Sequence, residues 1–287
     1  MLKFLSSALR RRPTRAVALA ATASVVAVLF VPGLAGALSL SSSVPAPPAS
    51  PTSADEIQNV DQVKTAIKGY YGDTVTSQLD PVAGTVALHE FSATGAYANE
   101  MAGVVADAEK ELGKPKAERN TGKAVLFDID DTTLNTYSYE IYSGFVFNPT
   151  TNAAFVNACL TATGCVFPAV PHMVDLEKYA ESQGYTVFFL SGRPISQHDG
   201  TVANLTHAGY DVNSADLYLK DASGATEPWL SPCAPTCTTT QYKSLTRAHI
   251  ESLGYDIVAN FGDQFSDLNG GFADETFKIP NPMYFLP

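Results

Sequence analysis

The sequence predicts an α/β fold in which helices cover both faces of a parallel β-sheet. Two observations carry this prediction. From residue 123 onward, short apolar runs rich in β-branched and aromatic residues alternate with helical patterns, which is typical of βαβ units. Several of these runs also end directly in acidic or hydroxyl residues. Ligands of such sheets bind beyond the carboxyl ends of the strands, so we expect the functional site at those ends.

Residues 1–37 are predicted to be a secretory signal peptide. Five basic residues come before an apolar run at 16–31, and Ala35-Gly36-Ala37 offers a small-x-small cleavage site. The apolar run is shorter than the roughly 20 residues that a membrane span needs, which favours cleavage over an uncleaved anchor helix. We therefore expect a secreted protein, extracellular or periplasmic, with no membrane attachment after cleavage.

Residues 38–54 are rich in Ser, Pro and Ala, and residues 55–122 carry two helical patterns. The first stretch is predicted to be an extended linker. The second is predicted to be a helical N-terminal extension. One helix ends near Gly72, and a longer one spans about 95–112, where apolar residues recur at helical spacing. We expect the apolar faces of these helices to pack in the core.

Residues 123–287 are expected to form the Rossmann-like core. Its predicted strands are 124–129, 186–191, 216–220 and 257–262. Two predicted helices lie between them, at 173–183 and 242–253, and Gly184 and Gly254 end these helices.

Composition and charge exclude several classes of protein. Hydrophobic residues make up 45% of the chain and charged residues 16%, which excludes a long disordered protein. Removal of the signal peptide leaves 13 basic and 29 acidic residues, a net charge of −16. Such a chain is not expected to bind nucleic acid polymers or anionic membranes. An anionic ligand would have to be held by a few placed cations and a metal ion.

The four cysteines predict two local disulfides. An even number of cysteines in a secreted chain favours disulfides, and proximity in sequence favours Cys159–Cys165 and Cys233–Cys237 among three possible pairings. A zinc site is the alternative, but the C-x5-C and C-x3-C spacings differ from those of zinc fingers and ribbons.

Three carboxylates follow the first predicted strand of the core. Asp128 and Asp130 begin on the same side of the chain as the strand ends, and Asp131 comes next. Three acids in four positions do not all stay ionised without a cation. Oxygen ligands that leave positions for water and phosphate suit a hard cation such as Mg²⁺. A solvated acidic turn is the alternative for this segment alone.

The later strand ends add donors and further acids. Ser191-Gly192-Arg193 follows the second strand and can offer hydroxyl and backbone N–H donors, although Ser-Gly also forms plain turns. Lys243 is predicted to lie in the first turn of a helix that Thr238, Thr239 or Thr240 can cap, and taken alone it is better interpreted as a surface lysine. Because cations are disfavoured at that end of a helix, another group should hold Lys243.

The last predicted strand leads to Gly262, Asp263 and Asp267. Gly262 allows the backbone a close approach. Asp263 is a candidate to complete a metal site, and Asp267 is a candidate either to orient that site or to hold Lys243.

In this order, these segments resemble the four motifs of the haloacid dehalogenase superfamily. The resemblance covers residues 123–287. Within the superfamily the chain is similar to secreted acid phosphatases of the class B and plant vegetative-storage type. The segments that carry the resemblance are FDIDDTTL at 127–134, FFLSGR at 188–193, YKSLTR at 242–247, GDQFSDL at 262–268 and FKIPNPMY at 277–284.

The resemblance implies a role for each site residue. Asp128 is implied as the nucleophile, and Asp130 as the group that protonates the leaving alcohol and later activates water. Ser191, Gly192, Arg193 and Lys243 are implied to bind the substrate. The implied ligands of Mg²⁺ are Asp128, the backbone carbonyl of Asp130, and Asp263, with Asp267 in support. A metal ion and a lysine would screen the repulsion between a carboxylate nucleophile and a phosphate dianion.

The insert at about 135–172 is implied to be a small cap after the first strand, which would shape substrate choice. Tyr137, Tyr139, Phe145 and Phe147 in this insert are candidates to stack on an aromatic leaving group. The alternative, which we favour, is that they form the core of the cap. For Arg193, contact with phosphate and pairing with an acid remain equal alternatives.

The sequence therefore predicts a secreted, Mg²⁺-dependent acid phosphatase that hydrolyses small phosphomonoesters through an aspartyl-phosphate. The alternatives are a phosphotransferase on the same fold and a catalytically silent storage or binding protein. Retention of Asp128 together with Asp130, Lys243 and Asp263 favours an enzyme.

Overall fold

The computed structural model describes residues 44–46, 49–115, 121–221, 223 and 227–286. The chain forms two units, Met1–Ser39 and Leu40–Pro287, and all of the described residues belong to the second. The predicted signal peptide and the first part of the predicted linker lie outside the described residues.

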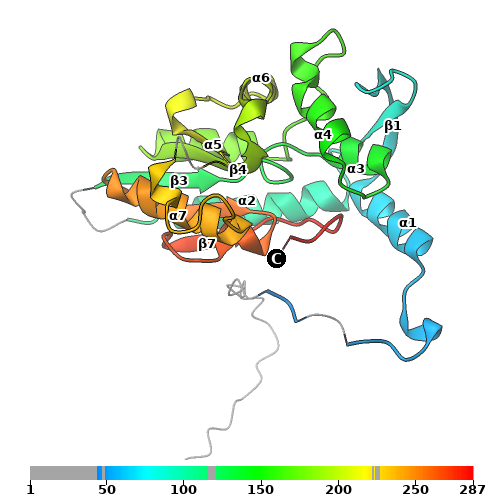
Figure 1. The fold of residues 1–287 in the computed structure, drawn as a ribbon, viewed down its shortest axis with the longest axis horizontal. Coiled ribbons are helices and arrows are strands. Elements are labelled where there is room, and N and C mark those ends of the chain that lie inside the picture. The colour runs from blue at the N-terminus through cyan, green and yellow to red at the C-terminus, as the bar shows by residue number, and fades with distance from the viewer. Residues whose placement is uncertain (1–43, 47–48, 116–120, 222, 224–226, 287) are drawn as a thin grey trace, which may run out of the picture. The chain divides into compact units, whose positions relative to one another are not determined.

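A five-stranded parallel sheet forms the centre of the second unit (Figure 1), which confirms the predicted fold class. The strand order is β5-β4-β3-β6-β7, and every neighbouring pair is parallel. The strands are β3 (Gly122–Phe127), β4 (Thr186–Pro194), β5 (Leu217–Lys220), β6 (Tyr255–Gly262) and β7 (Glu275–Lys278). Strands β3 and β6 are neighbours and run parallel. The acids that follow these two strands therefore lie at the same edge of the sheet.

Side-chain alternation along β3 divides the core between the two faces of the sheet. Val125 and Phe127 belong to one apolar cluster, and Ala124 and Leu126 belong to the other. Helices α2 (Ala96–Leu112), α5 (Met173–Ser182) and α6 (His198–Ala208) contribute buried residues to the first cluster, and α7 (Thr239–Ser252) contributes to the second. The helices predicted at about 95–112, 173–183 and 242–253 are therefore present.

The N-terminal segment contains an antiparallel hairpin besides its helices. Helix α1 (Val60–Tyr71) ends at Gly72, which has a φ of 69°, and is followed by β1 (Thr74–Leu79) and β2 (Ala87–Glu90). For this part of the chain the sequence predicted helices and no strands. Strand β1 has no buried residue, so it lacks the apolar alternation that would identify a half-buried strand.

The insert after β3 forms two short helices, α3 (Tyr137–Ser143) and α4 (Pro149–Val156), which a 3-10 turn extends to Leu160. Tyr137 and Tyr139 are buried, and Tyr137 stacks on Tyr71 with ring centroids 4.6 Å apart. These two tyrosines are therefore core residues, as favoured, and are not free to stack on a ligand. Phe145 packs against the core, while the Phe147 side chain is 70% exposed.

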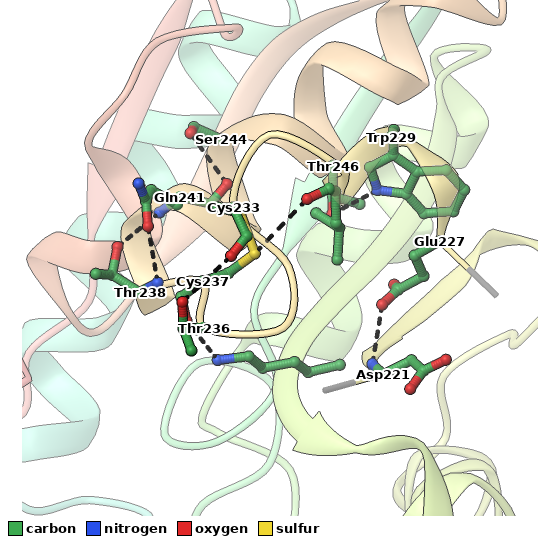
Figure 2. Close-up of a disulfide and its surroundings, with 12 residues drawn as sticks. Asp221, Glu227, Trp229, Cys233, Thr236, Cys237, Thr238, Gln241, Ser244 and Thr246 are labelled. Carbon is green, nitrogen blue, oxygen red and sulfur yellow. Dashed lines mark hydrogen bonds between the residues drawn. A yellow bond between two sulfur atoms is a disulfide. The ribbon is translucent and has the colours of Figure 1, made fainter. Parts of the chain in front are cut away.

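Both predicted disulfides are present, Cys159–Cys165 in the insert and Cys233–Cys237 before α7 (Figure 2), so these cysteines do not form a zinc site. Short α8 (Phe265–Leu268) completes the helices. Among the described residues, no helix is both long enough and apolar enough to cross a membrane.

Candidate active site

The carboxyl ends of β3, β4 and β6 bring the predicted site residues to one edge of the sheet. Asp128 follows β3 directly, and its backbone N–H donates to the carbonyl of Phe261 at 3.0 Å. Asp263 follows β6, and Ser191 lies within the last part of β4. Each side chain therefore starts from a strand that is buried and hydrogen-bonded on both sides, so the backbone beneath the site is rigid.

Helix α7 places Lys243 against this edge. Thr238, one of the three predicted capping residues, forms a capping box with Gln241 (Figure 2), so the helix begins at Thr239. Lys243 therefore lies in the second turn of the helix and not, as predicted, in the first, because the helix already begins at Thr239. Its buried ammonium group forms an ion pair with Asp128, donates to the carbonyl of Leu190 at 2.5 Å, and lies 3.2 Å from Asp267 Oδ1. As the sequence required, other groups hold this lysine.

Asp128, Asp263 and Asp267 form a buried acidic cluster. One carboxylate oxygen of each lies within 4.8 Å of the others. Burial raises the pKa of Asp128 well above its usual value, and burial together with Asp267 and Asp131 raises the pKa of Asp263 to about 8. Burial alone would lower the pKa of Lys243, but Asp128 and Asp267 outweigh it and raise that pKa. The cluster is thus short of positive charge, and its hard oxygen donors fit a divalent cation.

Gly262 is required for the approach of Asp267. A Cβ at position 262 would lie 2.4 Å from Asp267 Cβ and 2.9 Å from its Oδ2. That Oδ2 accepts the backbone N–H of Gln264 at 2.9 Å. The glycine at the end of β6 therefore allows the close approach of Asp267 to the backbone of residue 262.

Asp130 lies apart from the acidic cluster and pairs with Arg193. The Arg193 guanidinium donates to both carboxylate oxygens of Asp130, at 2.6 and 3.0 Å, and to Thr201 Oγ1 at 3.0 Å. Of the two alternatives for Arg193, the structure shows pairing with an acid. Among the described residues, the acidic cluster consists of Asp128, Asp263 and Asp267, and the carboxylate of Asp130 is not part of it.

Ser191 and Gly192 lie between Leu190, whose carbonyl accepts from Lys243, and Arg193, which pairs with Asp130. Ser191 is buried, and its Oγ accepts the backbone N–H of Arg193 at 3.1 Å. Gly192 is exposed, and a Cβ there would meet open space.

Three residues around the acids were not identified from the sequence. Asn281 and Gln264 both donate to Asp263 Oδ2 at 2.6 Å. Tyr284 donates to Asp131 Oδ2 at 2.9 Å. Asn281 and Tyr284 lie in the FKIPNPMY segment, so the resemblance marked the segment without indicating what these side chains contact.

Comparisons with known proteins agree with this geometry. Residues 78–287 match the family described as HAD superfamily, subfamily IIIB (acid phosphatase). The chain belongs to this family. A stretch of 166 residues is 35% identical to the Stem 28 kDa glycoprotein of Glycine max and covers 56% of this chain and 59% of that protein. A stretch of 188 residues is 32% identical to Acid phosphatase 1 of Solanum lycopersicum and covers 63% and 67% of the two chains.

A solved class C acid phosphatase from Bacillus anthracis has the same fold. The TM-score is 0.50 at 22% identity, and the likeness covers 66% of this chain and 80% of that one. Family membership thus rests on the sequence match, and the solved structure adds the fold. The chain spans 59% of the length of the first curated relative, the stem glycoprotein.

Proposed function

We propose that this protein is a secreted, Mg²⁺-dependent acid phosphatase that hydrolyses small phosphomonoesters. The observation that carries the proposal is the contact of Asp128 with Lys243 at the end of β3, beside Asp263 and Asp267. A buried carboxylate next to a fixed ammonium group and a cation site is arranged to attack an anionic electrophile.

Asp128, Asp263 and the backbone carbonyl of Asp130 would hold Mg²⁺, with Asp267 in support. Bound there, the ion would supply positive charge to the phosphoryl oxygens and screen the approach of the nucleophile. The raised pKa values of Asp128 and Asp263 fit this assignment, because a cation relieves the cost of ionising acids in a buried cluster.

The chain's own residues would divide the reaction between them. A carboxylate oxygen of Asp128 forms a bond to phosphorus as the bond to the leaving oxygen breaks. Asp130 gives its proton to that oxygen, and then takes a proton from the water that hydrolyses the aspartyl-phosphate. Arg193 orients Asp130 by its bidentate ion pair.

Lys243 and Ser191 would stabilise the transferring phosphoryl group. The Lys243 ammonium already lies at Asp128, so it reaches the phosphoryl oxygens as charge builds up in the transition state. Ser191 Oγ accepts an N–H from Arg193, so its own proton is directed to another acceptor, which a phosphoryl oxygen can supply.

The proposal includes secretion. Two disulfides have formed in the described part of the chain, which fits an oxidising compartment, and the first 37 residues have the composition of a signal peptide. N-terminal sequencing of the protein recovered from the culture medium or periplasm is expected to begin at Leu38. A protein that keeps residues 1–37 and stays with the membrane would contradict this part.

A silent storage or binding protein remains the second candidate. The name of the Glycine max relative describes a stem glycoprotein, whereas the Solanum relative is named a phosphatase. The presence of Asp128, Asp130 and Lys243 in one arrangement favours the enzyme over this candidate.

The decisive experiment measures phosphate release from an aryl phosphate by the mature protein. We expect turnover with Mg²⁺, loss of turnover with EDTA, and recovery when excess Mg²⁺ is added. Transfer of phosphate to added glycerol, measured in the same reaction, distinguishes a phosphotransferase from a hydrolase. No turnover with Mg²⁺ on a broad set of phosphorylated metabolites would favour the silent protein.

A further inference from the structure

The C-terminal segment that follows β7 returns to the acidic cluster. Residues 279–286 begin with Ile279, whose N–H donates to the carbonyl of Gly262 at 2.9 Å, directly before Asp263. From there the segment contacts three polar side chains of the site: Asp263, Gln264 and Asp131. We call residues 279–286 the closing segment.

Two amide side chains converge on one oxygen of Asp263. Asn281 Nδ2 and Gln264 Nε2 each donate to Asp263 Oδ2 at 2.6 Å. The other oxygen, Oδ1, receives only a long bond of 3.4 Å from the Thr132 hydroxyl in the described part of the chain. The two carboxylate oxygens are thus unequal, one held by the chain and one left for a ligand.

Backbone N–H groups of the closing segment orient both amides. The N–H of Met283 donates to Asn281 Oδ1 at 2.8 Å, and the N–H of Leu286 donates to Gln264 Oε1 at 2.7 Å. An amide oxygen that accepts a backbone N–H must present its NH₂ group elsewhere, and in both cases this group faces Asp263. The orientation of each amide therefore depends on the path of the closing segment.

We infer that Asn281 and Gln264 are positioning residues for the metal site, and that the closing segment holds them so that Asp263 presents Oδ1 to Mg²⁺. Partners of this kind fix the orientation of a ligand, and their loss typically weakens metal binding by about 10- to 100-fold. The inference rests on the proposed function, because it assumes that Asp263 is a metal ligand.

The closing segment then belongs to the active site, although it lies beyond the last of the four superfamily motifs. Tyr284 adds a further hydrogen bond to the site, because its hydroxyl donates to Asp131, the residue after Asp130. One segment thus connects the strand end that carries Asp263 with the loop that carries the proposed acid.

The test is Mg²⁺ binding to the metal-free mature protein, measured by titration calorimetry. We expect Asn281→Leu to raise the dissociation constant of Mg²⁺ by about 10-fold, because it keeps the side-chain size and removes the donor. Gln264→Leu should raise it in the same way, and Asn281→Ser should recover part of the affinity. The Mg²⁺ concentration for half-maximal turnover should rise with the dissociation constant, while kcat at saturating Mg²⁺ stays within about threefold.

Asn213 provides a matched control. Its Nδ2 donates to Asp216 at 2.7 Å and its Oδ1 accepts the N–H of Ala215 at 3.1 Å, so it repeats the pattern of Asn281 at an exposed site away from the acidic cluster. Asn213→Leu should leave Mg²⁺ binding unchanged.

The outcomes separate the inference from the proposed function. Wild-type affinity for Mg²⁺ in Gln264→Leu and in a folded Asn281→Leu variant would overturn the inference and leave the proposed function standing. A wild-type protein that does not bind Mg²⁺ would overturn both. If Asn281→Leu does not fold, Gln264→Leu decides the result, with circular dichroism as the check on folding.

Discussion

The buried carboxylate of Asp80 and the buried cluster of Asp128, Asp263 and Asp267 differ in the hydrogen-bond donors that surround them. Asp80, in the turn of the β1–β2 hairpin, is 1% exposed, and its two oxygens accept four backbone N–H groups, from Val82, Ala83, Thr85 and Val86. Burial raises the pKa of Asp80, but these four donors outweigh it and hold the pKa well below its usual value. Its charge is satisfied within the turn.

The cluster at the ends of β3 and β6 shows the reverse. Asp128 and Asp263 are also buried, but the groups that donate to them are side chains: Lys243 for Asp128, and Gln264, Asn281 and, by a long bond, Thr132 for Asp263. The pKa of both acids is raised. This difference in donors distinguishes a structural carboxylate from carboxylates that bind a ligand. A carboxylate that stabilises a turn is saturated by the chain, whereas carboxylates that bind a ligand are left short of donors and positive charge.

The largest expected effect distinguishes the two groups by activity. Asp128→Asn should lower turnover by at least about 10⁴-fold, because the amide cannot form the acyl-phosphate bond. The metal-free variant should still fold, because Lys243 keeps its contacts with Asp267 and with the carbonyl of Leu190. Phosphate release and urea unfolding measure the two effects. Unchanged turnover would exclude Asp128 as the nucleophile.

The second prediction concerns Asp80, whose substitution should lower stability and leave activity unchanged. Asp80→Ala should lower the free energy of unfolding by about 3 kcal/mol, because four backbone donors of the turn lose a charged acceptor. The Mg²⁺ affinity and the kcat of the folded fraction should stay at wild-type values. Asp80→Asn keeps one acceptor oxygen and should show an intermediate loss of stability. A loss of Mg²⁺ affinity without a loss of stability would contradict the comparison.

The sequence predicted the acids of the site better than it predicted their surroundings. Asp128, Asp263 and Asp267 were identified because they follow the ends of two buried strands, whereas Lys243 was identified through the resemblance of YKSLTR to a superfamily motif. Asn281 was not identified, because its contact with Asp263 spans 18 residues and depends on how the chain turns after β7.

Two of the strands that were missed, β7 and β1, share a physical reason. Strand β7 has no buried residue, and β1 has none either, so neither carries the apolar pattern by which a strand is recognised. Strand β7 is held by its ladder with β6, where Ala259 lies opposite Glu275 and Gly262 opposite Lys278. Tertiary pairing therefore decides these strands, and a single sequence does not reveal it.

Asp130 differs in burial from both Asp80 and the acidic cluster. It is partly exposed and is held by one side chain, Arg193. Arg193→Met should lower turnover by about 100-fold for alkyl phosphates, whose leaving oxygen needs a proton, and by about 10-fold or less for an aryl phosphate such as p-nitrophenyl phosphate. Thr201→Val removes only the outer partner of Arg193 and should have a smaller effect. Equal losses on both substrates would show that Arg193 does not act through Asp130.

Glu177 provides the smallest and last test, because it is a buried carboxylate with a single donor and no role in the site. Its Oε1 accepts the N–H of Asp211 at 3.2 Å, and its Oε2 has no partner in the described part of the chain. Burial, followed by Glu181 and Asp211, raises the pKa of Glu177 to about 7 from 4.5. Because the folded state holds this proton more tightly, the stabilisation is complete below pH 4.5 and is lost as the pH rises to 7.

Urea unfolding at pH 4.5 and pH 7.5 measures this loss. The wild-type free energy of unfolding should fall by about 2 kcal/mol more than that of Glu177→Gln, which stays neutral at both pH values. Other acids with raised pKa values titrate in both proteins, so the difference between the two proteins isolates Glu177. An equal fall in both would show that burial with a single donor does not hold a proton on this side chain, and would contradict the explanation given for Asp128 and Asp263 as well.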